Sequence, residues 1–183
     1  MPTNTNILMI RHAEKPDSGQ SLSELGQQRA EAYVSYFQNF KIGGTNIKLD
    51  YLFAAANSFE SHRPKLTLEP LAKALGLDIN DKYKDRDYSE LASKILEQSK
   101  YNQTNILISW HHQELLQFAE ALGVNPNNLL AQSHWPSPPW PDDVFNWLLQ
   151  LCYDASGNII PFQTCCINER LLADDDNKNP LIE

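Results

Sequence analysis

The segment Asn6-Ile7-Leu8-Met9-Ile10, followed at once by Arg11-His12, decides the fold of this chain. Its apolar residues follow one another without helical spacing, which favours a strand buried on both faces of a parallel sheet. Two later segments, Leu49–Ala55 (LDYLFAA) and Ile106–Trp110 (ILISW), have the same character. The sequence therefore predicts three buried strands.

Stretches with helical spacing follow these strands. Ser21 and Glu24 fit a capping box before the first stretch, and Gly76 and Gly123 fit helix stops after the second and the last. The predicted helices span about Ser23–Gln38, Leu68–Leu75, Tyr88–Gln98 and Leu115–Leu122. This alternation of strands and helices indicates an α/β fold of the three-layer αβα type with a mostly parallel sheet.

The last third of the chain departs from this pattern. Asn125–Asp143 contains Asn-Pro, Ser-Pro-Pro and Trp-Pro steps, which predict a long ordered loop. Its aromatic and proline residues could wall a pocket or pack on the core; they are Trp135, Pro136, Pro138, Pro139 and Trp140. Val144–Tyr153 and Asn158–Ile167 flank a turn-rich stretch, so an antiparallel pair at one sheet edge is expected. We expect a single domain over residues 1–183, with a mobile tail at 171–183.

Composition argues against several classes of protein. The net charge of -8 disfavours nucleic-acid binding, which needs a basic face to displace counterions from phosphates. No run of about 18 apolar residues predicts a membrane span, and no basic leader precedes an apolar core, so we expect a cytoplasmic protein. The three cysteines, two of them adjacent, fit neither a disulfide framework nor a zinc site.

The three predicted strands bring polar residues to one place. Ligands of open parallel sheets bind beyond the carboxyl ends of the strands. At those ends the sequence places Arg11-His12, the loop Asn57–Arg63 and His111-His112. The sequence thus predicts one convergent cationic site, where a few local arginines would meet an anionic substrate.

Sequence blocks around these positions form a recognisable series. Arg11–Pro16 (RHAEKP) is followed by Leu22–Ala30 (LSELGQQRA), and later by Ala56–Thr67, in which a threonine stands four residues after Arg63. A histidine that follows Ile106–Trp110 and precedes a helix completes the series. In this order the blocks resemble the RHG or RHA signature, the LTxxGxxQA block, the strand-loop-arginine-helix segment and the second histidine of the histidine phosphatase (phosphoglycerate mutase-like) superfamily. The resemblance covers about residues 6–123.

This resemblance implies a phosphatase that attacks a phosphate monoester or a phosphoprotein with His12 and forms a phosphohistidine. Arg11 and Arg63 offer planar charged forks for phosphoryl oxygens, and His112 can donate one more hydrogen bond. His12 must attack through a neutral ring nitrogen, so its other nitrogen should donate to a backbone carbonyl. Transition-state charge is then stabilised electrostatically, and neither a metal nor another cofactor is implied.

The acid that protonates the leaving oxygen stays open. Asp85 lies in a segment (DRDY) that resembles the one carrying a proton-donating glutamate in mutase-type relatives. Glu14, inside the signature, and Asp142 and Asp143, in the proline-rich loop, are alternatives.

The second histidine of the site also has two candidates. The common Gly-His form of the family selects His111, whereas its Trp-x-His form selects His112. Trp110 favours His112, and we expect its ring to face the phosphate while the ring of His111 turns away. A metal site is disfavoured, because adjacent side chains rarely ligate one ion and no HExxH spacing exists.

Rival functions share parts of this pattern. A phosphoglycerate mutase-type phosphotransferase would return the phosphoryl group to substrate, and a non-catalytic phosphate-binding or scaffolding protein would keep the pocket without turnover. Nucleotide-phosphate loops of the GxxxxGK[ST] or GxGxxG type are absent from the sequence. The substrate itself is not determined, because the recognised residues grip only the phosphoryl group.

Overall fold

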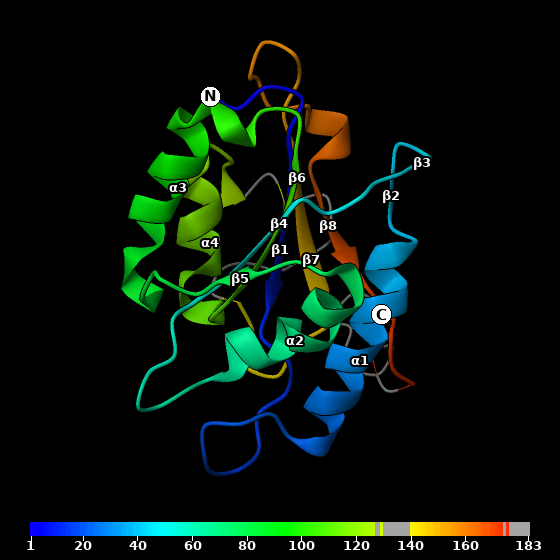
Figure 1. Ribbon diagram of the computed structural model, residues 1–183, viewed down its shortest axis with the longest axis vertical. Coiled ribbons are helices and arrows are strands. Elements are labelled where there is room, and N and C mark those ends of the chain that lie inside the picture. The colour runs from blue at the N-terminus through cyan, green and yellow to red at the C-terminus, as the bar shows by residue number, and fades with distance from the viewer. Residues whose placement is uncertain (127–128, 130–139, 174, 176–183) are drawn as a thin grey trace.

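The computed structural model describes residues 1–126, 129, 140–173 and 175. Its centre is a six-stranded sheet with the order β5-β4-β6-β1-β7-β8 (Figure 1). The strands are β1 (Asn6–Arg11), β4 (Tyr51–Ala54), β5 (Ile79–Asn80), β6 (Asn105–Trp110), β7 (Trp147–Cys152) and β8 (Cys165–Asn168). Strands β5, β4, β6 and β1 run parallel, and β7 is antiparallel to both of its neighbours. This is the mostly parallel sheet with an antiparallel edge that the sequence predicts.

In the described part of the chain, the two faces of the sheet are covered by helices α1 (Glu24–Gln38), α2 (Arg63–Leu75), α3 (Tyr88–Glu97) and α4 (His112–Ala121). Alternate residues of β1 pack to opposite sides: Ile7 and Met9 contact the α3 and α4 side, whereas Leu8 and Ile10 contact the α1 and α2 side. Both faces of the central strand are thus buried, and Figure 1 shows the resulting three layers.

Strand register aligns the ends of the central strands. Arg11 at the end of β1 pairs with Trp110 at the end of β6, and Ala54 at the end of β4 pairs with Ser109. Because parallel strands in register finish together, the loops that follow β1, β4 and β6 leave the sheet at one edge. This edge carries the candidate site.

Several elements differ from the sequence prediction. Helix α1 is capped by Ser23, whose hydroxyl accepts from the Gly26 amide, and not by a box that starts at Ser21. Strand β8 begins at Cys165 and not near Asn158, because Pro161 lacks an N–H for the ladder and opens the 3-10 turn Pro161–Gln163. The two-residue strands β5, β2 (Lys41–Ile42) and β3 (Thr45–Asn46) were missed because they are too short for periodicity.

Parts of two predicted segments lie outside the described residues. The proline-rich loop is described only at 125–126, 129 and 140–143, so its Trp135, Pro136, Pro138 and Pro139 are not placed. Trp140 is buried, contacts Trp147 and donates to the Val144 carbonyl, which makes it a core residue. Of the tail, 171–173 and 175 are described. No helix in the described ranges is both long and apolar enough to cross a bilayer.

Candidate active site

A cavity of about 720 Å³ opens at the carboxyl ends of β1, β4 and β6. We call it the cationic cavity. Its charged or titratable lining residues are Arg11, His12, Lys15, Glu60, Arg63, Lys84, Asp85, Arg86, Asp87, His111, His112 and Glu114. The predicted convergence is therefore present: the loops after three strands meet, and Arg11, His12, Arg63 and both adjacent histidines line one space.

Arg11 is held rigidly at the end of β1. Its side chain is buried, one guanidinium nitrogen donates to the carbonyls of Pro141, Asp142 and Val144 at 2.8 to 3.1 Å, and Phe145 stacks 3.7 Å from the guanidinium carbon. Burial lowers the pKa of Arg11 to about 10, so it stays charged at neutral pH. Its Nε is buried without a hydrogen-bond partner among the described residues and can meet an anion.

The imidazole of His12 has the tautomer that a nucleophile needs. Its Nδ1 lies 2.7 Å from the Ala13 carbonyl, a pure acceptor, so Nδ1 carries the hydrogen and donates it. The lone pair is then left on Nε2. Burial, followed by the nearby His111, lowers the pKa of His12 well below its ordinary value, and Arg11 and Arg63 act in the same direction. The ring is therefore neutral at neutral pH, with its lone pair on Nε2, the form that a histidine nucleophile needs.

Arg63 enters the cavity from the first turn of α2. One guanidinium nitrogen donates to the Gly19 carbonyl at 3.0 Å, and its Nε is buried without a partner among the described residues. Four residues later, the Thr67 hydroxyl donates to the Arg63 carbonyl and accepts from the Ala13 amide at 2.9 Å. The threonine thus joins the start of α2 to the segment that follows His12.

The two adjacent histidines have different surroundings. The ring of His111 lies against that of His12, with centroids 5.0 Å apart in an edge-to-face arrangement. His112 Nε2 instead lies 2.9 Å from the Asp142 carboxylate. The sequence predicts that the ring of His112 faces the phosphate and that of His111 turns away. In the structure both residues line the cavity, and it is the ring of His111 that contacts His12. The reason is local: His111 is the extended residue before α4 and His112 begins the helix, so their side chains leave the turn in different directions.

Residues of the Leu22–Ala30 block hold the segment that follows His12. The Ser23 amide donates to the Glu14 carbonyl, and a side chain at Gly26 would collide with that same carbonyl. Arg29 binds the Glu14 carboxylate through Nε and Nη2 at 2.7 to 3.0 Å. These contacts explain the residue types of the block: a glycine for close approach and a long donor for a buried carboxylate.

The four candidates for the general acid differ in exposure and in position relative to the cavity. Glu14 is occupied by Arg29 and does not line the cationic cavity, which removes it as a proton donor. The carboxylate of Asp142 is 93% exposed and faces His112, and Asp143 is also exposed. Only Asp85 of the four both lines the cavity and is partly buried.

Two residues of the site were missed by sequence reasoning. Phe145 stacks on Arg11 across more than a hundred residues of chain, and no local pattern marks it. Glu114 lines the cavity two residues after His112. A signal existed for Glu114, because an acidic residue in the first turn after a site histidine must lie near that site.

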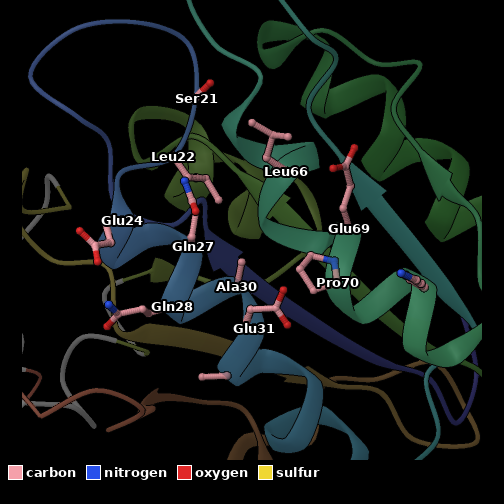
Figure 2. Close-up of a pocket in the computed structure, with 12 residues that line it drawn as sticks. Ser21, Leu22, Glu24, Gln27, Gln28, Ala30, Glu31, Leu66, Glu69 and Pro70 are labelled. Atoms are coloured by element: carbon pink, nitrogen blue, oxygen red, sulfur yellow. The ribbon is translucent and has the colours of Figure 1, made fainter.

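A second hollow, of about 950 Å³, lies between α1 and α2 and has a different character. Figure 2 shows its apolar side chains, Leu22, Ala30, Leu66 and Pro70, with Glu24, Glu31 and Glu69 around them. An acidic rim repels phosphate. The candidate active site is therefore the cationic cavity.

Comparisons with known proteins agree with this fold. The sequence matches no family model and no curated protein. The structure is similar to a protein named phosphohistidine phosphatase SixA from Agrobacterium tumefaciens, with a TM-score of 0.56, 21% identity, and coverage of 86% of this chain and 96% of that one. It is also similar to a protein histidine phosphatase SixA solved with tungstate, with a TM-score of 0.55, 14% identity, and coverage of 85% of this chain and 92% of that one. A third similar structure is a phosphohistidine phosphatase SixA from Nakamurella multipartitia, with a TM-score of 0.51, 14% identity, and coverage of 85% of this chain and 86% of that one. The chain thus has the histidine phosphatase (phosphoglycerate mutase-like) fold.

Proposed function

We propose that this protein is a phosphatase that hydrolyses phosphate esters through a phosphohistidine on His12. The observation that carries the proposal is the state of His12: its ring is neutral, its tautomer is set by the Ala13 carbonyl, and it stands among Arg11, Arg63 and His111. A neutral nucleophile surrounded by cations suits a dianionic phosphoryl group, because the cations attract the substrate while the nucleophile stays unprotonated.

Each neighbour of His12 has a proposed role. Arg11 and Arg63 bind phosphoryl oxygens and stabilise the charge that develops in the transition state. His111, in contact with the His12 ring, takes the hydrogen-bonding role that sequence reasoning assigned to His112. His112, which is hydrogen-bonded to Asp142, contacts the leaving group of the substrate at the outer side of the cavity.

The structurally similar proteins support only a broad class of substrate, namely phosphorylated compounds. Their names describe phosphohistidine phosphatases, and one was solved with tungstate, an oxyanion of phosphate-like shape. At 14 to 21% identity such likeness carries the fold and not the substrate. For this chain, a phosphate ester and a phosphoprotein are therefore both substrate hypotheses.

The test is to trap the phosphoenzyme. Wild-type protein mixed with 4-nitrophenyl phosphate should form an acid-labile, base-stable phosphoenzyme whose label maps to His12, and tungstate should compete with its formation. His12→Ala should lose the phosphoenzyme and at least about 1,000-fold in turnover, with the midpoint of thermal unfolding unchanged within a few degrees. Full turnover by His12→Ala would refute the proposal. Tungstate binding without any phosphate release would instead indicate a phosphate-binding protein.

A further inference from the structure

The hollow between α1 and α2, which we call the helix groove, shares no lining residue with the cationic cavity. Most of its lining residues recur at the spacing of a helix face: Glu24, Gln27, Gln28 and Glu31 on α1, and Leu66, Glu69, Pro70 and Lys73 on α2. Seven residues of helix span about 10 Å, so the groove follows about two turns of each helix. Figure 2 shows these side chains on the two neighbouring helices.

The floor of the helix groove is apolar. Leu22 and Ala30 are buried and form one small core cluster with Ala13. Leu66 packs against that cluster but stays partly exposed, as does Pro70. Because Pro70 has no N–H, the Leu66 carbonyl lacks the donor that another residue at this position of the helix would supply. The groove therefore offers apolar contact together with a backbone acceptor that has lost its helical donor.

The rim of the helix groove is acidic. It carries three exposed carboxylates, those of Glu24, Glu31 and Glu69. No ion pair among the residues that the structure describes includes any of them. Lys65, one turn before Glu69, is paired elsewhere, and Lys73 is the only cation of the described residues that lines the groove. The rim therefore attracts cations.

These features select the chemistry of an occupant. An apolar floor flanked by carboxylates is complementary to a basic amphipathic helix, in which apolar residues recur at helical spacing among lysines or arginines. Nucleic acids and anionic lipid surfaces have the wrong charge for this rim. A second copy of the chain is disfavoured, because two copies with a net charge of -8 repel each other.

We propose that the helix groove is a docking site for a basic amphipathic helix of a partner protein. Apolar side chains of that helix cover Leu66 and Pro70, and its cations pair with Glu31 and Glu69. A donor at the edge of the helix, such as a lysine or arginine side chain, can bind the Leu66 carbonyl. This inference goes beyond the phosphatase function and does not depend on it.

The docking site lies next to the active site. Ala13, in the core cluster under the floor, supplies the carbonyl that accepts from His12. Gly19, two residues before the lining residue Ser21, accepts a hydrogen bond from the Arg63 guanidinium. A partner docked in the groove is thus held beside the cationic cavity without entering it.

A designed peptide tests the docking site on the full chain. The probe is a fluorescent peptide of about 14 residues, or four helical turns, with leucine and lysine at helical spacing. Two matched peptides replace every lysine by glutamate or every leucine by serine, and both should bind at least about tenfold more weakly in fluorescence anisotropy. Amide shifts in ¹⁵N–¹H spectra should cluster in residues 21–32 and 66–73. Equal binding of the serine peptide, or shifts confined to other segments, would overturn the inference.

Charge variants separate the groove from the overall charge of the protein. The double variant Glu31→Gln with Glu69→Gln should weaken the leucine–lysine peptide about fivefold or more, as expected for two exposed ion pairs. Lys73→Gln removes the repelling cation and should tighten binding about twofold. Glu97→Gln with Glu120→Gln makes the same charge change at exposed positions of α3 and α4 and should leave binding within twofold. Equal losses in the two double variants would refute the docking site.

The same peptide distinguishes this inference from the proposed function. His12→Ala, which should lose turnover and the phosphoenzyme, should bind the leucine–lysine peptide as tightly as the wild type, because His12 does not line the groove. Weak peptide binding by an active wild-type protein would refute the docking site alone. Tight, groove-specific binding by a protein without phosphatase activity would support the docking site and contradict the proposed function.

Discussion

Two groups of charged and titratable side chains share the segment Arg11–Glu14, and their charges are arranged in opposite ways. In one, which we call the paired cluster, the carboxyl groups of Glu14, Glu169 and Asp175 surround the single cation Arg29. In the other, the cationic cavity, Arg11, His12, Arg63 and His111 are cationic or neutral and share no ion pair with one another. One residue of sequence, Ala13, lies between His12 of the arrangement suited to binding an anion and Glu14 of the arrangement that stabilises the fold.

The paired cluster holds Arg29 between two carboxylates. Arg29 Nη2 lies 2.7 Å from Glu14 and 2.6 Å from Asp175, and the Tyr33 hydroxyl donates to Glu169. Burial disfavours the charged form of Arg29, but the hydrogen bonds that it donates to Asp175 and Glu14 outweigh this effect and raise its pKa. The pKa of Asp175 is shifted in the opposite direction. Burial opposes its ionisation, but hydrogen bonds from Arg29 and from backbone N–H groups lower its pKa. Such a cluster is stable only while complete.

In the cationic cavity, neither Arg11 nor Arg63 forms an ion pair with any of the described residues. Burial lowers the pKa values of Arg11, His12, Arg63 and His111, the last to about 4. All four pKa values are lowered, which means that the protonated, charged form of each group is destabilised in the cavity. A bound phosphoryl group would offset this destabilisation, because its negative charge favours the protonated forms. Perturbed groups of this kind concentrate at functional sites.

Removing an arginine from each group should give opposite results. Arg29→Ala leaves Glu14 and Asp175 buried without their partner and should lower the free energy of unfolding by about 3–5 kcal/mol in a urea titration. Arg63→Ala should change stability by less than about 1 kcal/mol and lower kcat/KM about 100-fold. Gln28→Ala, an exposed change on the helix of Arg29, is the control. A loss below about 1 kcal/mol for Arg29→Ala would show that the paired cluster is not structural.

Within the cationic cavity, the two histidines should differ in turnover. His111→Ala removes the ring that contacts His12 and should lower kcat/KM about 30-fold, whereas His112→Ala should lower it by less than about fivefold. Kinetics on one aryl phosphate ester, with both variants checked for folding by circular dichroism, decide the ranking. If His112→Ala were the more damaged variant, the Trp-x-His alignment would be right and His112 would be the phosphate ligand.

The smallest expected effect is a pH dependence in the paired cluster. Burial raises the pKa of Glu169 to about 8, against an ordinary value near 4.5. Between these values the folded protein binds more protons than the unfolded chain, so the free energy of unfolding should fall as the pH rises from about 5 to 8. Asp85 contributes a slope of the same sign. Glu169→Gln should flatten the decline by about 1 kcal/mol in urea titrations at several pH values; an unchanged slope would contradict this prediction.

Sequence patterns alone predicted the local features of this structure. The apolar runs of β1, β4 and β6 predict buried strands, and their shared direction predicts that Arg11, His12 and Arg63 converge. The need of His12 for a backbone acceptor also follows from the chemistry alone, and the Ala13 carbonyl fulfils it. These predictions succeed because each depends on a few consecutive residues and on the general geometry of parallel sheets.

Tertiary structure decided what depends on contacts between distant segments. Arg29 meets Asp175 across 146 residues of sequence, Phe145 stacks on Arg11, and neither pair leaves a periodic trace in the chain. Which of His111 and His112 contacts the His12 ring depended on the backbone of one strand-to-helix turn, where a single residue changes the direction of a side chain.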